Sequence, residues 1–336
     1  MEKVNHSITF RHANEIVFIG SGDLMIASIR LAKAKGFIVK IVLSKRHSEE
    51  KLIFHKGTVA EVCRELTPDV FICEQSVTDI PQSFVLGERS LALCFGPAWI
   101  FNQDFISLFH YGMWNYNGIP IPEYLGGAHF SWQIMNEDLQ GGCFIQEICD
   151  TVDRGDIIKF QYYSVNSNSK TPEAYYSDAF EEGIDFLERF LEDVELGKEF
   201  ECLPFCSIEK PTLYFPRLKT FENSWVDWNW SVDEIDAFCR AFSVPYAGAS
   251  TQLLGRTILI TKSEILERRT MHPFAAGLIL NTFYESSSVI VGARGGLLKL
   301  NLNLDSHEIE LNVGDRLFTP PDILVRAKLY RPRFGN

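Results

Sequence analysis

Two polar segments of the chain carry amides and carboxylates that could serve one site. The first runs from Asn115 to Asn117, and the second is the acidic turn from Asp150 to Asp156. Each follows a predicted strand, and ligands in open α/β sheets bind just outside the carboxyl ends of the strands. Amides can hydrogen-bond a ligand there, and carboxylates can exchange protons with it. The same residue types also form ordinary turns, so the two segments alone leave both interpretations open.

A third polar segment has part of a dinucleotide-binding pattern. Gly20-Ser21-Gly22 lies between a predicted strand and a predicted helix, but Met25 stands where the pattern needs its third glycine. The next strand is followed by Lys45 and Arg46, which could accept the 2′-phosphate of NADP. An NADP-dependent oxidoreductase is therefore one hypothesis. The alternative is that these glycines only make the tight turn of a βαβ unit, and the incomplete pattern favours it.

These segments sit between elements that predict an α/β fold. Residues 15–20 are a buried strand, residues 24–35 have helical apolar spacing closed by Gly36, and residues 37–43 are a β-branched strand. This βαβ unit implies parallel strands covered on both faces, hence an open, doubly wound, Rossmann-like sheet. The further predicted elements of this part are a helix at 59–66, strands at 69–73 and 91–95, a helix at 130–136, strands at 142–149 and 157–165, and a helix at 171–195.

The composition changes after the last of these helices. Residues 206–224 read as a linker between a first domain at 1–205 and a second at 225–336. The second domain opens with a helix at 232–242, in which Ser231 and Glu234 form a capping-box pattern. Short strands separated by turns follow, which is typical of a small, OB-like β-barrel. The predicted strands lie at 252–253, 256–261, 277–283, 288–291 and 297–303.

The net charge and the composition argue against several kinds of binding partner. The formal net charge is −12, which argues against nucleic acid, since phosphate contacts need clustered Lys and Arg. The eight cysteines contain no Cys-x-x-Cys pair and no metal-ligand spacing, so we expect free thiols, a reducing compartment and no metal. No apolar run is long enough to span a bilayer and the N-terminus has no apolar leader segment, which predicts a cytoplasmic protein without membrane association.

The polar segments also resemble a known family. Residues Asn115 to Pro122 are similar to the Asn-x-His-x-Ser-Leu-Leu-Pro loop of the methionyl-tRNA and sugar N-formyltransferases, and Asp153 to Asp156 take the place of their later Asp-Thr-Gly-Asp turn. The 38 residues from position 115 to position 153 match the spacing of that pattern. Gly126, Asp227-Trp228 and residues 240–249 extend the resemblance into the C-terminal barrel domain. The resemblance therefore covers most of the chain.

The resemblance implies a reaction and a set of roles. Enzymes of this family move a formyl group from N10-formyltetrahydrofolate to an amine with an Asn–His–Asp triad, for which this chain offers Asn115, Asn117 and Asp153. Asn115 could still donate to the developing oxyanion, which is worth roughly 10²–10³ in rate. Asn117 replaces the histidine, and because an amide does not titrate near pH 7, a general acid–base share of roughly 10²–10⁴ is lost unless another group supplies it.

His129 is the candidate for that replacement. It follows Gly126-Gly127-Ala128 at the start of the helix that borders the active site in the resembling enzymes. A lone histidine is more often structural than catalytic, so both interpretations stay open. Ile119 and Leu125 are further departures from the family pattern. Together with Asn117 they indicate a changed reaction, a changed substrate or a degraded site.

The resemblance also predicts where the folate would lie. The predicted folate-binding residues are Phe95, Gly96, Trp99, Ile100, Phe101, Ile148, Cys149, Asp150, Thr151 and Val152. The aromatic ones among them could equally be core residues at a strand end.

The expected acceptor is the amine of a small molecule, either an amino sugar on a nucleotide or an amino acid derivative. Only residues 44–68 separate the second and third strands, whereas the tRNA-modifying members carry a long insertion there. A catalytically altered homologue that only binds a small molecule is the second hypothesis, supported by the missing histidine. Whether the C-terminal domain binds the acceptor, a partner protein or a second copy in a homodimer is left open.

Overall fold

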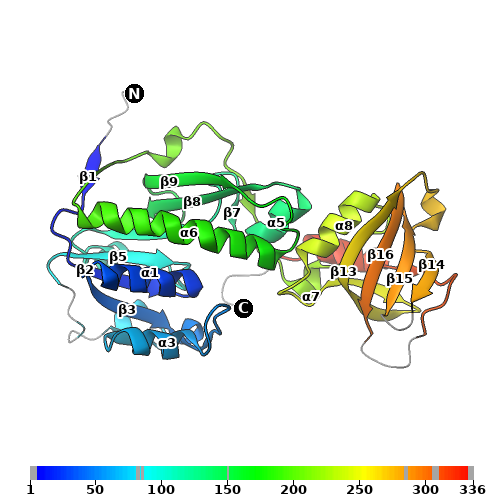
Figure 1. Ribbon diagram of the computed structural model, residues 1–336, viewed down its shortest axis with the longest axis horizontal. Helices are drawn as coiled ribbons and strands as arrows, with labels where there is room; N and C mark the ends of the chain where they lie inside the picture. Colours follow the sequence, from blue (N-terminus) through cyan, green and yellow to red (C-terminus); the bar gives the residue numbers. More distant parts are fainter. Residues whose placement is uncertain are drawn as a thin grey trace. The chain divides into compact units, whose positions relative to one another are not determined.

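The computed structural model describes residues 6–80, 84, 87–149, 151–283, 287–304 and 310–331 (Figure 1). The chain forms two compact units. The first consists of Met1–Glu123, Gln140–Ser164 and Ala179–Thr212, and the second of Tyr124–Leu139, Val165–Asp178 and Leu213–Asn336. Compactness thus groups two short segments of the predicted first domain with the C-terminal part. The domain boundaries 1–205, 206–224 and 225–336 remain a proposal.

A seven-stranded sheet in the order β4-β3-β2-β5-β6-β8-β9 forms the centre of the first unit. The first five strands are parallel, and β6-β8 and β8-β9 are antiparallel. The strands are β2 (Glu15–Gly20), β3 (Ile38–Ser44), β4 (Val70–Cys73), β5 (Ser90–Phe95), β6 (Met113–Asn117), β8 (Gln140–Glu147) and β9 (Ile157–Ser164). The predicted doubly wound α/β fold is confirmed, with an antiparallel extension at one side.

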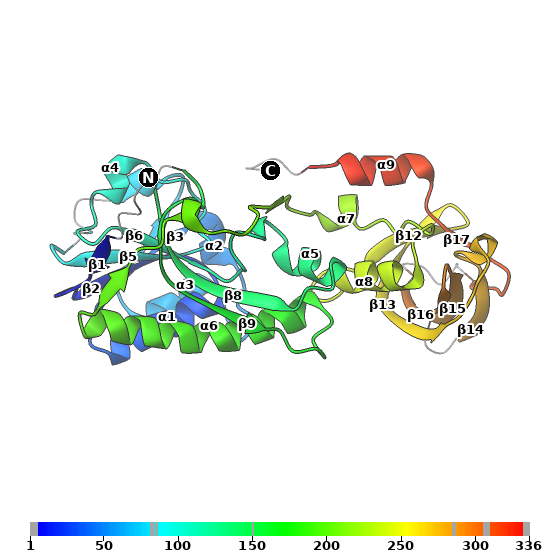
Figure 2. The ribbon, with the colours of Figure 1, turned by 90° about the horizontal axis from the view of Figure 1, so that it is seen from above.

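Alternation along the buried strands sends side chains to both faces of the sheet. Ile16 and Phe18 of β2 join the core under helices α1 (Asp23–Ala34), α3 (Val59–Leu66) and α6 (Pro172–Glu195). Val17 and Ile19 join a second core on the opposite face, beneath α4 (Gln103–Ile106). Figure 2 shows α1 and α6 on one side of the sheet and α4 on the other. The continuous apolar runs therefore produce a sheet buried on both faces.

Several short elements complete the first unit. They are β1 (Ser7–Thr9), paired with β10 (Glu199–Glu201), the helix α2 (Lys45–Glu49) after β3, and the 3₁₀ turns η1 (Val77–Asp79) and η2 (Phe205–Ser207). None of them was predicted, because elements of three to five residues show too little periodicity to be recognised.

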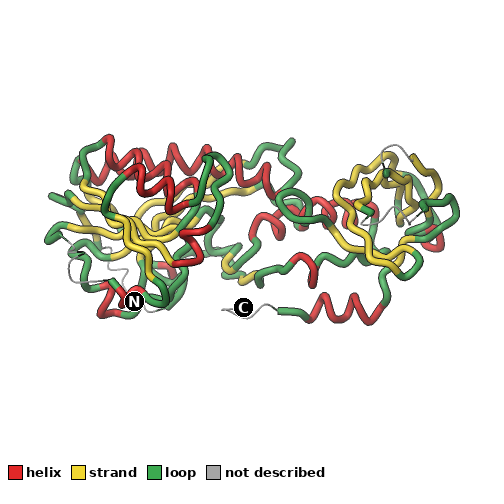
Figure 3. Tube along the Cα trace, turned by 90° about the horizontal axis from the view of Figure 1, so that it is seen from below, coloured by secondary structure: helices red, strands yellow, loops and turns green. Residues whose placement is uncertain are grey.

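The second unit contains a curled antiparallel sheet in the order β14-β15-β16-β13-β12-β17. Its strands are β12 (Ala249–Leu253), β13 (Arg256–Arg268), β14 (Ile279–Phe283), β15 (Ser288–Ala293), β16 (Gly296–Asn303) and β17 (Leu317–Phe318). Ile279 N–H donates to the Asp315 carbonyl at 2.8 Å, and Leu317 N–H to the Gly277 carbonyl at 2.8 Å, so the sheet curls back on itself (Figure 3). The predicted small barrel is confirmed.

Helix α8 (Val232–Ala241) covers this sheet. Its capping box forms as predicted, with the Ser231 hydroxyl accepting from Glu234 N–H and the Glu234 carboxylate accepting from Ser231 N–H. The Ser263 hydroxyl of β13 donates to buried Asp236 at 2.7 Å. The remaining elements of this unit are α5 (His129–Met135), α7 (Thr220–Asn223), α9 (Pro321–Leu329), η3 (Pro273–Ala275), and β7 (Leu125–Gly126) paired with β11 (Tyr214–Phe215).

Candidate active site

Strand β6 holds Asn115 and Asn117 at the seam where the parallel and antiparallel parts of the sheet meet. It is parallel to β5 on one side and antiparallel to β8 on the other. Residues two apart in a strand face the same side, so both amides lie on one face near the carboxyl end of the strand. The predicted loop residues are thus strand residues, and their positions are set by the sheet ladder.

Strand β8 adds a third amide to this face. Its register places Gln146 directly opposite Asn115, and the Gln146 side chain is 1% exposed. Asn115 Nδ2 donates to Asn117 Oδ1 at 2.8 Å, and Asn117 Nδ2 donates to Gln146 Oε1 at 3.0 Å. Gln146 Nε2 in turn donates to the Gly155 carbonyl at 3.0 Å. The three side chains form one amide chain, defined here as Asn115, Asn117 and Gln146, that ends on backbone.

The direction of this amide chain is fixed at its backbone end. A carbonyl can only accept, so Gln146 must turn its NH₂ toward Gly155 and its oxygen toward Asn117. Each following amide then has its orientation set in the same way. Asn115 Oδ1 is left buried without a hydrogen-bond partner among the described residues. A buried acceptor without a partner lowers the free energy of unfolding by roughly 1–3 kcal/mol. Unpaired buried polar groups in native proteins often belong to functional sites.

The turn between β8 and β9 is held against β8 by a close backbone approach. A Cβ on Gly155 would lie 2.1 Å from the Glu147 carbonyl oxygen, which no side chain permits. Glu147 N–H donates to the Asp156 carbonyl at 2.8 Å in the same turn. Asp153 lies in this turn with a φ of 55°, a left-handed conformation that Asp tolerates better than most residues. The amide chain therefore ends on the same turn that carries Asp153.

Asp153 is the group of this site that can exchange a proton. Burial raises the pKa of its carboxyl, and the neighbouring Arg154 guanidinium acts in the opposite direction. A carboxylate with a raised pKa is a stronger base than an exposed one. Asn117 cannot contribute in this way, because an amide does not titrate.

His129 belongs to the second unit, whereas Asn115, Asn117 and Asp153 belong to the first. It is the first residue of α5, after Ala128 at a φ of 56°. Its Nε2 is buried with no described partner, and burial lowers the pKa of the imidazole to about 4. The side chain is thus neutral at pH 7. It could accept a hydrogen bond but would not serve as a general acid at that pH.

The predicted folate-binding residues of the β5 end divide between core and surface. The Phe95 ring stacks on Tyr116 with centroids 5.6 Å apart, and Gly96 follows at a φ of 55°. Phe101 is 4% exposed and packs in the second core. Trp99 Nε1 donates to the Gln75 carbonyl at 3.3 Å. Ile100, in contrast, is 76% exposed.

The other predicted folate-binding segment follows β8. Ile148 N–H donates to the Met113 carbonyl at 2.8 Å, which extends the β6-β8 ladder. Cys149 Sγ lies 3.2 Å from the Thr151 carbonyl, and Val152 is 59% exposed. Asp150 lies outside the described residues. The segment thus offers an exposed apolar side chain beside the turn of Asp153.

Sequence reasoning missed Gln146. It is the polar residue in the buried run Cys143-Phe144-Ile145-Gln146, and a polar side chain inside such a strand normally has a hydrogen-bonding role. The sequence alone shows this polar residue in an apolar run. It does not show the strand register that pairs Gln146 with Asn115.

The glycine turn after β2 does not favour the oxidoreductase hypothesis. Ser21 Oγ donates to the Glu50 carboxylate at 2.5 Å, and Arg46 Nε lies 3.8 Å from the same carboxylate. Lys45 Nζ is 3.6 Å from Glu74. A carboxylate bound to this turn would repel a pyrophosphate, and both cations proposed for the 2′-phosphate already have acidic partners.

The described residues contain neither a membrane-spanning helix nor a metal-binding cluster. None of the helices there is both long and apolar enough to cross a membrane. Nor do three or more His, Cys, Asp or Glu side chains gather there in a way that could hold a metal ion.

Comparison with known proteins agrees with this architecture. Residues 219–309 match the family model of the formyl transferase C-terminal domain. The bifunctional polymyxin resistance protein ArnA of Wigglesworthia glossinidia brevipalpis is 26% identical over 54% of this chain and 27% of its own length. The methionyl-tRNA formyltransferase of Natranaerobius thermophilus is 26% identical over 43% of this chain and 45% of its own length. The chain thus spans less than half of these two relatives.

A third relative matches at greater length. The methionyl-tRNA formyltransferase of Methylacidiphilum infernorum is 23% identical over 87% of this chain and 91% of its own length.

Solved structures resemble almost the whole chain. WlaRD, a sugar 3N-formyl transferase solved in the presence of dTDP and 5-N-formyl-THF, superimposes with a TM-score of 0.65 at 16% identity, over 88% of this chain and 99% of its own. The N-formyltransferase of Helicobacter canadensis, in complex with folinic acid and dTDP-3-aminofucose, gives a TM-score of 0.64 at 14% identity, over 86% and 99%. At these identities the likeness establishes the fold. The predicted resemblance to the formyltransferase family is confirmed.

Proposed function

We propose that this formyltransferase relative transfers a formyl group from a formyl-folate to the amine of a small acceptor, with an amino sugar on a nucleotide as first choice. The observation that carries the proposal is the amide chain on β6 and β8, which runs from Asn115 through Asn117 and Gln146 to the Gly155 carbonyl, in the turn that also carries Asp153. The names of the similar structures, which include a formyl-folate and dTDP-linked ligands, support the choice of donor and acceptor.

The residues present fit a folate. Ile100 and Val152 are exposed apolar side chains in the two predicted folate-binding segments, beside strands β5 and β8. The orphan acceptor Asn115 Oδ1 is a group that an N–H of a ligand could satisfy. When bound, the formyl-folate would supply an activated formyl group, whose bond to the folate nitrogen breaks as the bond to the amine forms.

Each side chain of the site then has a task. Asn115 keeps one N–H that the amide chain does not use, and it would donate this to the formyl oxygen as negative charge develops there. Asp153 would take the proton that the amine gives up and pass it to the folate nitrogen as that nitrogen leaves, for which the pKa raised by burial is suited. Gln146 would hold Asn117, and through it Asn115, in one orientation.

A binding module without catalysis is the second candidate. It is favoured by Asn117, which replaces the titrating residue of the family pattern and whose amide is engaged with Asn115 and Gln146. This candidate predicts folate or amine binding without turnover.

Calorimetric titration with 5-formyl-tetrahydrofolate tests the proposal. We expect binding by the full chain, weakened in Asp153→Ala and unchanged in the matched control Asp185→Ala, an exposed carboxylate on α6. Incubation with N10-formyltetrahydrofolate and dTDP-3-aminofucose or related amino sugars should then release tetrahydrofolate. Folate binding without turnover of any amine would support the binding module. Absence of folate binding would refute formyl transfer, and absence of amine binding as well would refute both candidates.

A further inference from the structure

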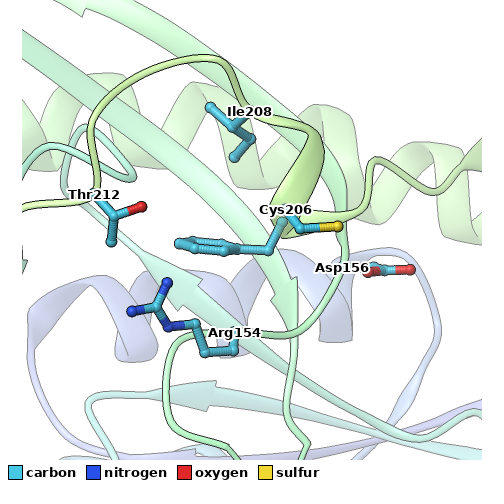
Figure 4. A pocket seen from close by; sticks show the side chains of 6 residues that line it. Arg154, Asp156, Cys206, Ile208 and Thr212 are labelled. Atoms are coloured by element: carbon cyan, nitrogen blue, oxygen red, sulfur yellow. The ribbon is translucent and has the colours of Figure 1, made fainter. Parts of the chain in front are cut away.

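The first unit contains a cavity next to the turn of Asp153 that the predicted roles do not use. It has a volume of about 320 Å³ and lies between that turn and the segment that begins with η2. Its lining residues are Arg154, Asp156, Phe205, Cys206, Ile208 and Thr212, most of which are labelled in Figure 4. A cavity of this size accommodates a phosphate or carboxylate group with part of the molecule that carries it.

Arg154 is the cation among the residues that line this cavity, and no acidic side chain of the described residues forms an ion pair with it. Its guanidinium carbon lies 4.8 Å from the centre of the Phe205 ring. No ion pair with a carboxylate is found for it within the described ranges of the chain. Contact with an aromatic ring fixes a guanidinium in place and leaves N–H groups free for a further partner. Those N–H groups are suited to a bidentate contact with an oxyanion.

The positions of the other polar side chains that line the cavity, Thr212 and Asp156, are compatible with an anion bound at Arg154. The Thr212 hydroxyl can donate a second hydrogen bond. Figure 4 shows Thr212 and the Arg154 guanidinium toward one end of the cavity and Asp156 toward the other. The Asp156 carboxylate lies 3.6 Å from His6 Nε2, and His6 does not line the cavity.

We propose that this cavity is an anion subsite, in which Arg154 and Thr212 bind a phosphate or carboxylate group of the acceptor molecule. The identity of that molecule as the acceptor rests on the proposed function, whereas the binding of an anion does not. Arg154 directly follows Asp153, so an anion held there would keep the rest of the acceptor beside the proposed base. The amine and the anion would then be recognised by neighbouring residues of one turn.

Titration of the full chain with dTDP, inorganic phosphate and succinate tests the subsite. We expect binding of at least one probe, weakened roughly 10-fold or more in Arg154→Gln and less in Arg154→Lys, because Lys keeps the charge and loses the bidentate contact. The matched control is Arg64→Gln, an exposed arginine on α3 outside the cavity. A preference for dTDP and phosphate over succinate would identify a phosphate group, and the reverse a carboxylate.

Two outcomes would overturn the subsite: no binding of any probe by the unmodified chain, or equal binding by Arg154→Gln. Titration of the same variant with 5-formyl-tetrahydrofolate separates the two proposals. Loss of anion binding with normal folate binding supports both. Arg154-dependent anion binding without folate binding would leave the subsite and refute the proposed function.

Cys206 provides a readout that needs no substitution. It is the exposed cysteine among eight, of which Cys149 is partly exposed and the other six are buried. Because Cys206 lines the cavity, an anion bound at Arg154 should slow its alkylation by iodoacetamide several-fold, as measured by peptide mass spectrometry. An unchanged alkylation rate at a saturating concentration of a probe that binds would place the bound anion elsewhere and contradict the proposal.

Discussion

Two polar clusters lie at carboxyl ends of strands in the same sheet, and they differ in how completely their charges are paired. After β2 and β3, the Asp23 carboxylate accepts from Ile53 N–H, Phe54 N–H and His55 Nδ1 at 2.9 to 3.0 Å. Ser21 and Arg46 share Glu50 in the same region. Among the described residues of this cluster, the buried polar atom without a partner is Nδ1 of His47, whose pKa burial lowers, so the ring is neutral at pH 7.

After β6 and β8 the situation is different. Asn115 Oδ1 has no described partner, Asp153 is an acid whose pKa burial raises, and Arg154 contacts a ring instead of a carboxylate. The first cluster holds a loop in place with charges that satisfy one another. The second leaves charged and polar groups without such partners at a cost in stability, a pattern that is common at functional sites. Substitutions in the two clusters should therefore have different consequences.

Asp153→Asn should have the largest effect, a loss of roughly 10²–10⁴ in kcat/KM, because it removes the proposed base. In the unmodified chain, activity should fall as pH decreases through the Asp153 pKa, which burial places above that of an exposed Asp. A pH–rate profile of formyl transfer measures this limb. Activity of Asp153→Asn close to that of the unmodified chain would remove Asp153 from the mechanism and weaken the contrast between the clusters.

Asn115→Ala should come next, with a loss of roughly 10²–10³ in kcat, as expected for one donor to a developing oxyanion. Folate affinity should change far less, since the contact strengthens only as charge develops. Steady-state kinetics together with a folate titration separate these two quantities. A large loss of folate affinity at unchanged kcat would instead make Asn115 a binding residue.

Gln146→Met should lower kcat about tenfold, because Asn117 and Asn115 would lose the support that fixes their orientation. A merely structural role would lower kcat by the same factor whether or not Asn115 is present. If Gln146 acts through Asn115, the substitution should cost little in an Asn115→Ala background. The double-mutant cycle in kcat is the measurement, and additive effects would contradict the positioning role.

The smallest effects are on stability, and they should have opposite signs in the two clusters. Asp23→Asn should lower the free energy of unfolding by about 2 kcal/mol, since a charged acceptor of three N–H groups is weakened. Asp153→Asn should raise it at neutral pH. The folded-state pKa of Asp153 is raised, so its carboxyl favours folding below the unfolded-state pKa, and this contribution is lost as pH rises through the folded-state pKa.

Thermal unfolding of both variants at pH 3 and pH 7.5 checks this pair. The gain from Asp153→Asn should appear at pH 7.5 and vanish at pH 3, where both the wild-type acid and the amide are neutral. If both substitutions destabilise at pH 7.5 to the same degree, the two clusters do not differ in the way described.

More of the fold than of the candidate site could be predicted from the sequence. The strand at Glu15–Gly20 and the helix at Val59–Leu66 have the bounds predicted, because buried runs and capping signals are local. Helix α9 was not predicted, although Pro321 is its first residue and proline is common at that position. β13 extends to Arg268, beyond the predicted end at 261, through two bulges that disturb its alternation.

The site depends on information that is not local. The residues Asn115 and Asp153 could be predicted from their family-like spacing, and their roles remain proposals. The amide chain could not be predicted, because it requires the cross-strand register that places Gln146 opposite Asn115. His129 was expected at the start of a helix and is the first residue of α5, yet its assignment to the second unit depends on contacts across the whole chain.

Gly155 shows that a residue with no reactive side chain can tolerate substitution as poorly as a catalytic residue. The Glu147 carbonyl oxygen lies where the first side-chain atom of any other residue would be placed. In a library of all single substitutions selected for growth or activity, position 155 should therefore be depleted of every alternative, alanine included, to the same extent as position 153. In such a data set position 155 would look like a second catalytic residue. The cause of the depletion is instead steric, because two backbone segments approach each other too closely there for any side chain.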